Sequence, residues 1–294
     1  MRVVVASDAL AGLSPAGASE AIAAAFAGQG AEVAVVQLGV IGRPLREGLA
    51  ASAPEFHVAS PRTPGELVEA LAVDAPSIVL DLTTIECDDL GRGALGPDPR
   101  GALEALRRAC AGRRVVALVQ ESQVDRELTG LAGHASIELR AKGADLAQVL
   151  AADLEAERWA AELGLAPAPG SGAAGGLGLL IQGIGGVVAD PLGFLADRFG
   201  LASTIARADL VVTGAESLDF HALGGPVVKR VAALATEALR PVIGIVGRNF
   251  VSSRELRLAG FEAAYPLLRG AGDGNAEPRR LGEVAAHVAR TWIW

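Results

Sequence analysis

The sequence contains few of the residues that mark metal-binding or disulfide-bonded proteins. Its 294 residues include two cysteines and four histidines. Cys87 and Cys110 do not form a C-x-x-C pattern, and the histidines are well separated, with no H-E-x-x-H pattern. We therefore expect neither a disulfide framework nor a metal site built from histidine and cysteine.

Long hydrophobic runs are also missing. The longest one, near residues 177–184, is interrupted by Gln182 and Gly183 and is too short for a membrane span. Arg2 follows Met1 directly, so the start of the chain has no secretory hydrophobic region. We expect a cytoplasmic protein with no membrane partner.

Excess positive charge is absent as well. The formal net charge is −8 and the basic residues are scattered, so nucleic acid is not an expected partner. Aromatic residues make up only 4% of the chain, whereas 51% of it is hydrophobic, mostly alanine, valine and leucine. This composition is typical of an α/β protein with valine-rich strands and alanine-rich helices.

Short valine- and isoleucine-rich runs alternate with helical segments, which is the pattern of parallel βα units. Strands are expected at residues 2–7, 32–38, 77–82, 114–119, 210–212, 242–246 and 263–266. A capping residue followed by proline predicts helix starts after Ser14, Thr63, Asp98 and Asp190. The longest helix is expected at 145–163, with an apolar face of Leu146, Val149, Leu150 and Leu154.

A glycine-rich segment, residues 169–178, matches the G-x-G-x-x-G pattern at Gly170, Gly172 and Gly175. A dinucleotide site would need a buried strand just before the glycines, but two prolines stand there, so the segment does not support an oxidoreductase. Two interpretations stay open. The turn from Gly170 to Gly175 presents its amide groups to an anion, or the glycines serve close helix packing, as we expect for Gly176 and Gly178.

Polar side chains follow four of the expected strands, and the carboxyl ends of parallel strands are where open α/β sheets bind ligands. The four segments are residues 7–14 with Asp8, 83–91 with Asp88 and Asp89, 123–130 with Asp125, and 213–219 with Glu216 and Asp219. For each carboxylate, the alternative is a solvated loop or turn residue.

Three blocks in order, residues 169–178, 208–214 and 241–247, make the sequence resemble the bacterial type I glycerate kinase family over nearly the whole chain. The resemblance implies ATP- and Mg²⁺-dependent phosphorylation of the 2-hydroxyl of D-glycerate or a similar small hydroxy acid. It also implies an α/β fold of two domains. A flavodoxin-like parallel-sheet domain would comprise residues 1–52 and 166–294, and an inserted, shortened α/β domain residues 53–165. No Walker A motif is present, consistent with a kinase outside the P-loop class.

The resemblance also implies roles for individual residues. Asp125 and Asp219 would be catalytic, as acid/base groups or Mg²⁺ ligands. Substrate and phosphate would contact Asp8, Gly170, Ser171, Gly172, Gly175, Thr213, Gly214, Glu216 and His221. Asp88 and Asp89 are a weaker candidate for a metal site, because adjacent carboxylates repel unless a cation bridges them.

Several charged positions of the family pattern are replaced in this chain. Ala11 and Pro226 stand in place of lysines, Gln123 in place of an aspartate, and Ala215–Ser217 in place of Glu-Gly-Arg. These replacements keep a second hypothesis open, in which the protein is an inactive paralogue that retains the fold and binds a small anion. A homodimer is also left open.

Overall fold

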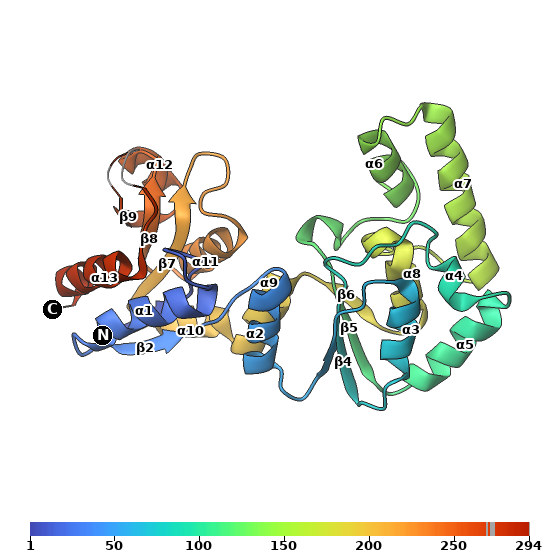
Figure 1. Cartoon of the computed structure of the whole chain (residues 1–294), viewed down its shortest axis with the longest axis horizontal. Helices are drawn as coiled ribbons and strands as arrows, with labels where there is room; N and C mark the ends of the chain where they lie inside the picture. Colours follow the sequence, from blue (N-terminus) through green and yellow to red (C-terminus); the bar gives the residue numbers. More distant parts are fainter. Residues whose placement is uncertain (269, 271–273, 294) are drawn as a thin grey trace. The chain divides into compact units, whose positions relative to one another are not determined.

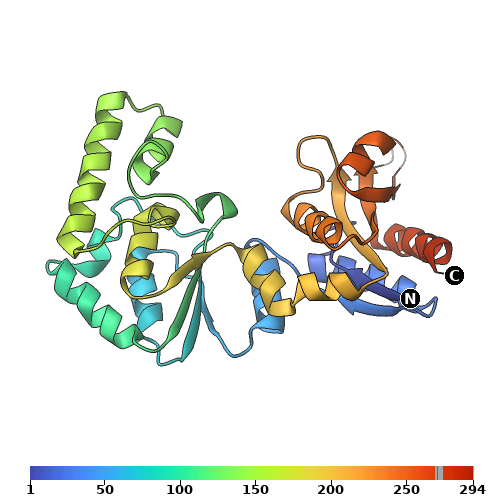
Figure 2. The ribbon, with the colours of Figure 1, turned by 180° about the vertical axis from the view of Figure 1, so that it is seen from behind.

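The computed structural model describes residues 1–268, 270 and 274–293, and the chain forms two compact units (Figures 1 and 2). Unit 1 comprises Met1–Ala53 and Leu192–Trp294, and unit 2 comprises Pro54–Pro191. Trp294, the last residue of the range predicted for the first domain, lies outside the described residues. The chain therefore leaves unit 1 once, builds unit 2 from one continuous stretch and returns.

Unit 1 contains a five-stranded parallel sheet in the order β2-β1-β7-β8-β9. Its strands are β1 (Arg2–Val5), β2 (Glu32–Val35), β7 (Leu210–Leu218), β8 (Val242–Asn249) and β9 (Phe261–Pro266). Counted within the unit, this order is 2-1-3-4-5, that of flavodoxin-like folds. The predicted fold class, including a flavodoxin-like sheet built from both chain ends, is confirmed.

Helices cover both faces of this sheet. On one face, α1 (Pro15–Ala27) and α13 (Pro278–Trp292) bury Ile22, Phe26 and Val288 against β1 and β7. On the other face lie α10 (Leu201–Arg207) and α11 (Pro226–Glu237). The remaining helices of the unit are α2 (Gly42–Ser52), α9 (Pro191–Phe199) and α12 (Ser253–Leu258).

Unit 2 contains a four-stranded parallel sheet in the order β3-β4-β5-β6. Its strands are β3 (His57–Ala59), β4 (Ser77–Asp81), β5 (Arg114–Leu118) and β6 (Val187–Ala189). Residues 166–191 were expected in the first domain, and this expectation is wrong, because Val187 of β6 pairs with Val116 of β5. A three-residue strand after two glycines carries too short a pattern to be recognised in the sequence.

The helices of unit 2 surround one hydrophobic core in which Leu80, Ala117, Trp159 and Leu177 are buried. They are α3 (Pro64–Ala72), α4 (Arg92–Leu95), α5 (Pro99–Cys110), α6 (His134–Ala141), α7 (Leu146–Leu163) and α8 (Leu177–Gly183), with short 3₁₀ turns η1 (Glu121–Gln123) and η2 (Ala173–Gly176). The predicted caps of α3 and α5 are confirmed, because the side chains of Thr63 and Asp98 accept hydrogen bonds from first-turn amides.

The apolar face predicted for α7 is wrong. Val149 is buried, but Leu146, Leu150 and Leu154 are exposed. The helix instead packs through Ala156, Trp159, Ala160 and Leu163 of its second half. On that side of the helix, small alanine side chains pack against the core. The prediction followed the spacing of the leucines and therefore chose the wrong face. Within the described residues, no helix is both long and apolar enough to cross a membrane.

Candidate functional site

The topology of unit 1 creates a place for a ligand at the carboxyl ends of β1 and β7. From β1 the chain proceeds through α1 to β2 on one side, whereas β7, β8 and β9 follow on the other side. The direction of strand addition reverses between β1 and β7, and such a reversal point is where open α/β sheets usually bind their ligands. In unit 2 the sheet order follows the chain order, so no such reversal occurs.

Asp8 lies at this switch point. Its amide donates to the carbonyl of Gly214, 2.8 Å away, which extends the β1–β7 pairing beyond the end of β1. The Asp8 carboxylate accepts a hydrogen bond from the Ala9 amide at 2.7 Å. Burial raises the pKa of this half-buried carboxylate, more than the hydrogen bond from Ala9 lowers it.

A tight turn places Glu216 at the same edge. Leu10 and Leu13 pair across Ala11 and Gly12, which both have positive φ angles, 56° and 74°. The Gly12 amide donates to Glu216 Oε1 at 3.4 Å. Ala11 is buried, so at the position where the resemblance expects a lysine the chain has an enclosed methyl group and no charge.

Thr213 and Gly214 lie within β7, because this strand continues to Leu218 and does not end at Val212 as predicted. Both residues are buried, and the Thr213 hydroxyl has no hydrogen-bond partner. A Cβ at Gly214 would come within 2.5 Å of the Ile245 carbonyl and 2.7 Å of Ser7 Oγ. These two residues, which were predicted to contact substrate, are therefore packed inside the strand.

Asp219 forms a local turn after β7. Its Oδ1 accepts from the amides of Ala222 at 2.7 Å and His221 at 2.9 Å. These hydrogen bonds, that of Ala222 above all, lower the pKa of Asp219, and the nearby His221 and Lys229 side chains lower it further. Such a carboxylate stays ionised and is a weak proton acceptor, so it suits a loop-holding or cation-holding role better than that of a base.

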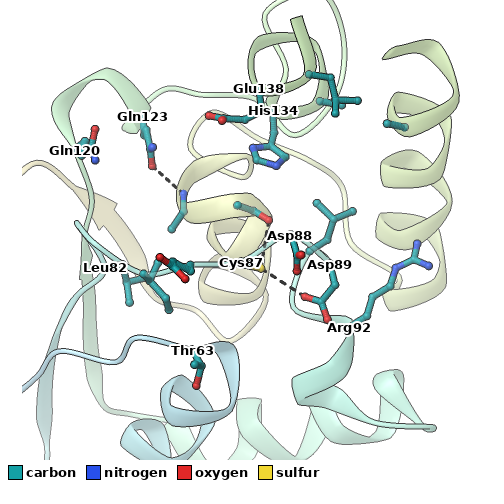
Figure 3. Close-up of a pocket in the computed structure, with 18 of the residues that line it drawn as sticks. Thr63, Leu82, Cys87, Asp88, Asp89, Arg92, Gln120, Gln123, His134 and Glu138 are labelled. Atoms are coloured by element: carbon teal, nitrogen blue, oxygen red, sulfur yellow. Dashed lines mark hydrogen bonds between the residues drawn. The ribbon is translucent and has the colours of Figure 1, made fainter. Parts of the chain in front are cut away.

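The other predicted site residues lie in unit 2, and some of them line a pocket of about 990 Å³ at the carboxyl ends of β4 and β5 (Figure 3). Asp88, Asp89, Gln123 and Gly175 line this pocket, together with Arg92, His134 and Lys142. Figure 3 shows Asp89, Gln123, His134 and Thr63 around it.

The two adjacent aspartates differ in role. The Asp89 carboxylate accepts from the amides of Gly93 at 2.7 Å and Gly91 at 2.9 Å, at the start of α4. Partial burial acts to raise the pKa of Asp89, but these hydrogen bonds together outweigh it and lower the pKa. Asp89 is thus a helix-capping residue, whereas Asp88 is exposed at the pocket edge.

The glycine-rich segment is packed against neighbouring loops, and the backbone amides at its start are already hydrogen-bonded within the protein. The amides of Ser171, Gly172 and Ala173 donate to the carbonyls of Ala168, Arg126 and Gly170. Side-chain atoms added at Gly172 or Gly175 would overlap the carbonyl oxygens of Glu127 or Cys87. This corrects the anion-turn interpretation for Gly170, Ser171 and Gly172, which are buried. Gly175 alone of the predicted glycines lines the pocket.

Asp125 is exposed in the turn after η1 and does not line this pocket. Its neighbour Gln123 does, and the Gln123 side-chain carbonyl accepts from the Ala174 amide at 3.0 Å. This glutamine therefore fastens the loop after β5 to η2. An amide does not take up a proton near neutral pH, so Gln123 cannot act as the carboxylate that the resemblance implies at this position.

His134 was not recognised from the sequence, although it lines the pocket of unit 2. Its Nδ1 is buried without a hydrogen-bond partner. Burial lowers the pKa of His134, and Arg126 and Lys142 lower it further, against the opposing effect of Glu138. The imidazole is therefore neutral at pH 7. A histidine at the first position of a short helix carries no sequence signal for this role.

Cys87 also lines the pocket, with Sγ 3.6 Å from Asp89 Oδ1 and 3.5 Å from the Gly175 carbonyl. Burial raises the pKa of its thiol to about 11, so it stays protonated and unreactive.

Nothing among the described residues forms a cluster of three or more His, Cys, Asp or Glu side chains that could hold a metal ion. Mg²⁺ that arrives with a nucleotide needs only one or two protein carboxylates, because phosphate oxygens and waters complete its shell. Glu216, an exposed carboxylate near the end of β7, fits this requirement.

The chain was compared with known proteins. The model of the glycerate kinase family matches residues 90–293. Uncharacterized proteins of Mycobacterium bovis and Mycobacterium tuberculosis are each 35% identical over 215 residues, which cover 71% of this chain and 55% of theirs. This chain thus matches about half the length of these curated relatives.

A crystal structure of a Salmonella typhimurium LT2 protein provisionally named glycerate kinase 2 has the same fold, with a TM-score of 0.71. It is 21% identical, and the match covers 99% of this chain and 98% of the other. The family match extends over more than half of the described chain and includes parts of both units. The chain belongs to the glycerate kinase family.

Proposed function

We propose that this protein is a glycerate-kinase-type phosphotransferase that transfers the γ-phosphoryl group of ATP to the 2-hydroxyl of D-glycerate or a similar small hydroxy acid. Family membership supports the reaction class. The observation that carries the proposal is the half-buried carboxylate of Asp8 at the switch point of the unit 1 sheet, with its pKa raised by burial.

In the proposed reaction the acceptor hydroxyl oxygen bonds to the γ-phosphorus, the bond to the β–γ bridging oxygen breaks, and ADP leaves. The hydroxyl proton passes to the carboxylate of Asp8. A raised pKa improves this carboxylate as a proton acceptor, because general bases work best when their pKa approaches the working pH. Mg²⁺ bound with the nucleotide would neutralise phosphate charge, and Glu216 would be its protein ligand.

The test measures ADP release with Mg·ATP and D-glycerate. Asp8→Asn keeps the size of the side chain and removes the base, so we expect kcat to fall about 100-fold or more. Asp74→Asn is the matched control, because Asp74 is a fully exposed carboxylate on unit 2 that only pairs with Arg113 at 3.4 Å. Equal activity of the Asp8→Asn variant and the wild type would contradict the role of Asp8.

The second candidate function is a binding protein without phosphotransferase activity. The buried methyl group of Ala11 favours it, because this residue brings no charge to the position where the resemblance implies a lysine. In that case the wild type would show no turnover with D-glycerate, while Mg·ATP or a small organic anion would still raise its melting temperature.

A further inference from the structure

We propose that one exposed face of α7 is a dimerisation surface, on which the α7 helix of a second copy of this chain packs in antiparallel orientation. The surface, which we name the α7 stripe, consists of five exposed apolar residues: Leu146, Ala147, Leu150, Ala151 and Leu154. Self-association through this face is independent of the proposed reaction, because it needs neither nucleotide nor acceptor.

The leucines of the stripe lie on consecutive turns of one side of α7. They are spaced four residues apart, and because each residue advances the helix by about 100°, each leucine lies roughly 40° from the one before. Leu146 is 63% exposed, Leu150 is 59% exposed and Leu154 is 46% exposed. The polar residues of this segment, Gln148 and Asp153, lie outside the arc that the stripe occupies. The stripe is therefore continuous and apolar.

The stripe is not part of the packing that holds α7 in unit 2. That packing uses the other side of the helix, where Trp159 and Leu163 are buried in the core. Leu131, Leu239 and Leu258 are more exposed than the stripe leucines, but each stands alone. The first lies in the loop before α6, the second follows α11 and the third ends α12. Single exposed leucines are common, whereas a continuous apolar face marks an interaction surface.

The position of α7 leaves the stripe open to another helix. Figures 1 and 2 show α7 along the outer edge of unit 2, with α6 on its inner side. The helix has 18 residues, so its length is about 27 Å. A second helix of this length can contact the whole stripe at once.

A second copy of α7 matches the stripe when the two helices run in opposite directions. With the two Leu150 side chains at the twofold axis, Leu146 of each copy lies opposite Leu154 of the other. Side chains four residues apart form a ridge, and the small alanines beside this ridge leave a groove for the leucines of the second copy. A twofold axis repeats every contact, so one helix supplies both halves of the interface.

Unpaired charges at the two ends of the stripe match in the same orientation. Lys142 lies just after α6, in the turn that leads to α7, and Glu157 lies about one turn beyond Leu154. Both side chains are exposed, and neither makes an ion pair within the part of the chain that the structure describes. The two positions are almost equally far from Leu150 along the chain, so Lys142 of each copy comes to the level of Glu157 of the other. The symmetry then provides this ion pair twice.

A membrane or an unrelated protein matches this surface less well. Helices that lie on membranes carry Lys and Arg beside their apolar face, whereas the charged residues of α7 are four acids and one arginine: Asp153, Glu155, Glu157, Glu162 and Arg158. An unrelated protein would need its own matching ridge and charges, which a second copy already has. Stable interfaces bury about 800 Å² on each side, and one helix face provides less, so we expect a reversible dimer with a micromolar Kd.

Sedimentation velocity of the full chain, from about 1 µM to about 200 µM, tests this dimer. We expect the wild type to shift from monomer to dimer as the concentration rises. Leu150→Glu places two like charges at the twofold axis, so its Kd should rise about 100-fold or more. Glutamate favours helix, and circular dichroism checks that the variant is folded. Leu258→Glu is the matched control, since Leu258 is 80% exposed in unit 1, and its dimer should equal that of the wild type.

Exchanging the end charges tests the antiparallel register. Lys142→Glu and Glu157→Lys should each weaken the dimer about fivefold, and the double variant should regain the wild-type Kd, because its ion pairs form with the charges exchanged. A double variant that dimerises more weakly than either single variant would overturn this register.

Two results would overturn the surface itself. One is a wild type that stays monomeric throughout, and binding of that monomer to vesicles of anionic lipid would assign the stripe to a membrane instead. The other is a Leu150→Glu variant that dimerises as the wild type does. None of these outcomes depends on phosphorylation of a hydroxy acid, so the proposed function and the dimer stand or fall separately.

Discussion

Both units are parallel α/β sheets, yet they use the carboxyl ends of their strands differently. In unit 1 the order of strands reverses between β1 and β7, and the edge there carries carboxylates that are not needed to hold a helix. In unit 2 the order does not reverse, and the loops at the same end are fastened to one another by the glycine-rich segment. Topology therefore decides where polar residues remain available for chemistry.

Asp89 and Asp8 illustrate this difference. Asp89 gives its oxygens to the amides that begin α4, and its pKa is lowered despite partial burial. Asp8 receives one local amide, and burial raises its pKa. A carboxylate of the first kind stabilises a loop, whereas one of the second kind can exchange a proton with a ligand.

The largest effect is expected from a methyl group added to the glycine-rich segment. Gly172→Ala would force a Cβ against the carbonyl oxygen of Glu127, so we expect unit 2 to lose about 3 kcal/mol or more of stability. Urea unfolding, followed by the fluorescence of the buried Trp159, measures this loss.

Gly282→Ala is the control for that substitution. Gly282 lies inside α13 of unit 1, and a Cβ added there meets nothing within 4 Å. Alanine should therefore stabilise the helix by about 0.5–1 kcal/mol. If Gly172→Ala is as harmless as Gly282→Ala, the glycine-rich segment is not a packing element, and the anion-binding interpretation regains support.

A buried histidine at the pocket of unit 2 should make the stability of the protein depend on pH. The pKa of His134 is lowered by burial below its ordinary value of 6.5. Below pH 6.5, His134 binds a proton in the unfolded chain but stays neutral in the folded chain. The free energy of unfolding therefore decreases as the pH drops through this range. Arg126 and Lys142 add to this lowering of the pKa, whereas Glu138 opposes it.

His134→Gln removes this titration. We expect the urea midpoint of the variant to change less than that of the wild type between pH 7.5 and pH 5.5, and to match it at pH 7.5 to within about 1 kcal/mol in stability. Parallel pH profiles for the two proteins would show that His134 is not held neutral by its surroundings.

The smallest expected effect concerns Thr213. Its hydroxyl is buried in β7 without a partner, so Thr213→Val replaces an unsatisfied polar group by a methyl group of the same shape. We expect stability to rise or stay level, by about 1 kcal/mol at most, and substrate KM to stay unchanged. A large increase in KM would place the hydroxyl in the binding site, as the family resemblance implied.

Much of the fold follows from local patterns in the sequence. Capping residues such as Thr63, with proline after them, mark helix starts, and strands such as β4 stand out as short buried runs of branched residues. Local patterns could not predict the β6 strand or the exposure of the α7 leucines. Strand pairing and the choice of a packing face depend on residues far away in the sequence.

The candidate site was predictable in part. Asp8 and Glu216 follow from their places at strand ends, and the structure puts them at one edge. The packing role of Gly172 required knowing that the Arg126–Leu128 loop lies against it.

The division of unit 1 into two chain segments has a consequence for the order of folding. The Arg2 amide donates to the carboxylate of Asp209, which lies 207 residues later in the chain. At 5–20 residues per second, synthesis of that interval takes roughly 10–40 s. During this time β1 has no β7 beside it, whereas unit 2, a continuous stretch, acquires all of its strands. We therefore expect nascent chains that end before β7 to hold a folded unit 2 and an unpaired, aggregation-prone strand edge at β1.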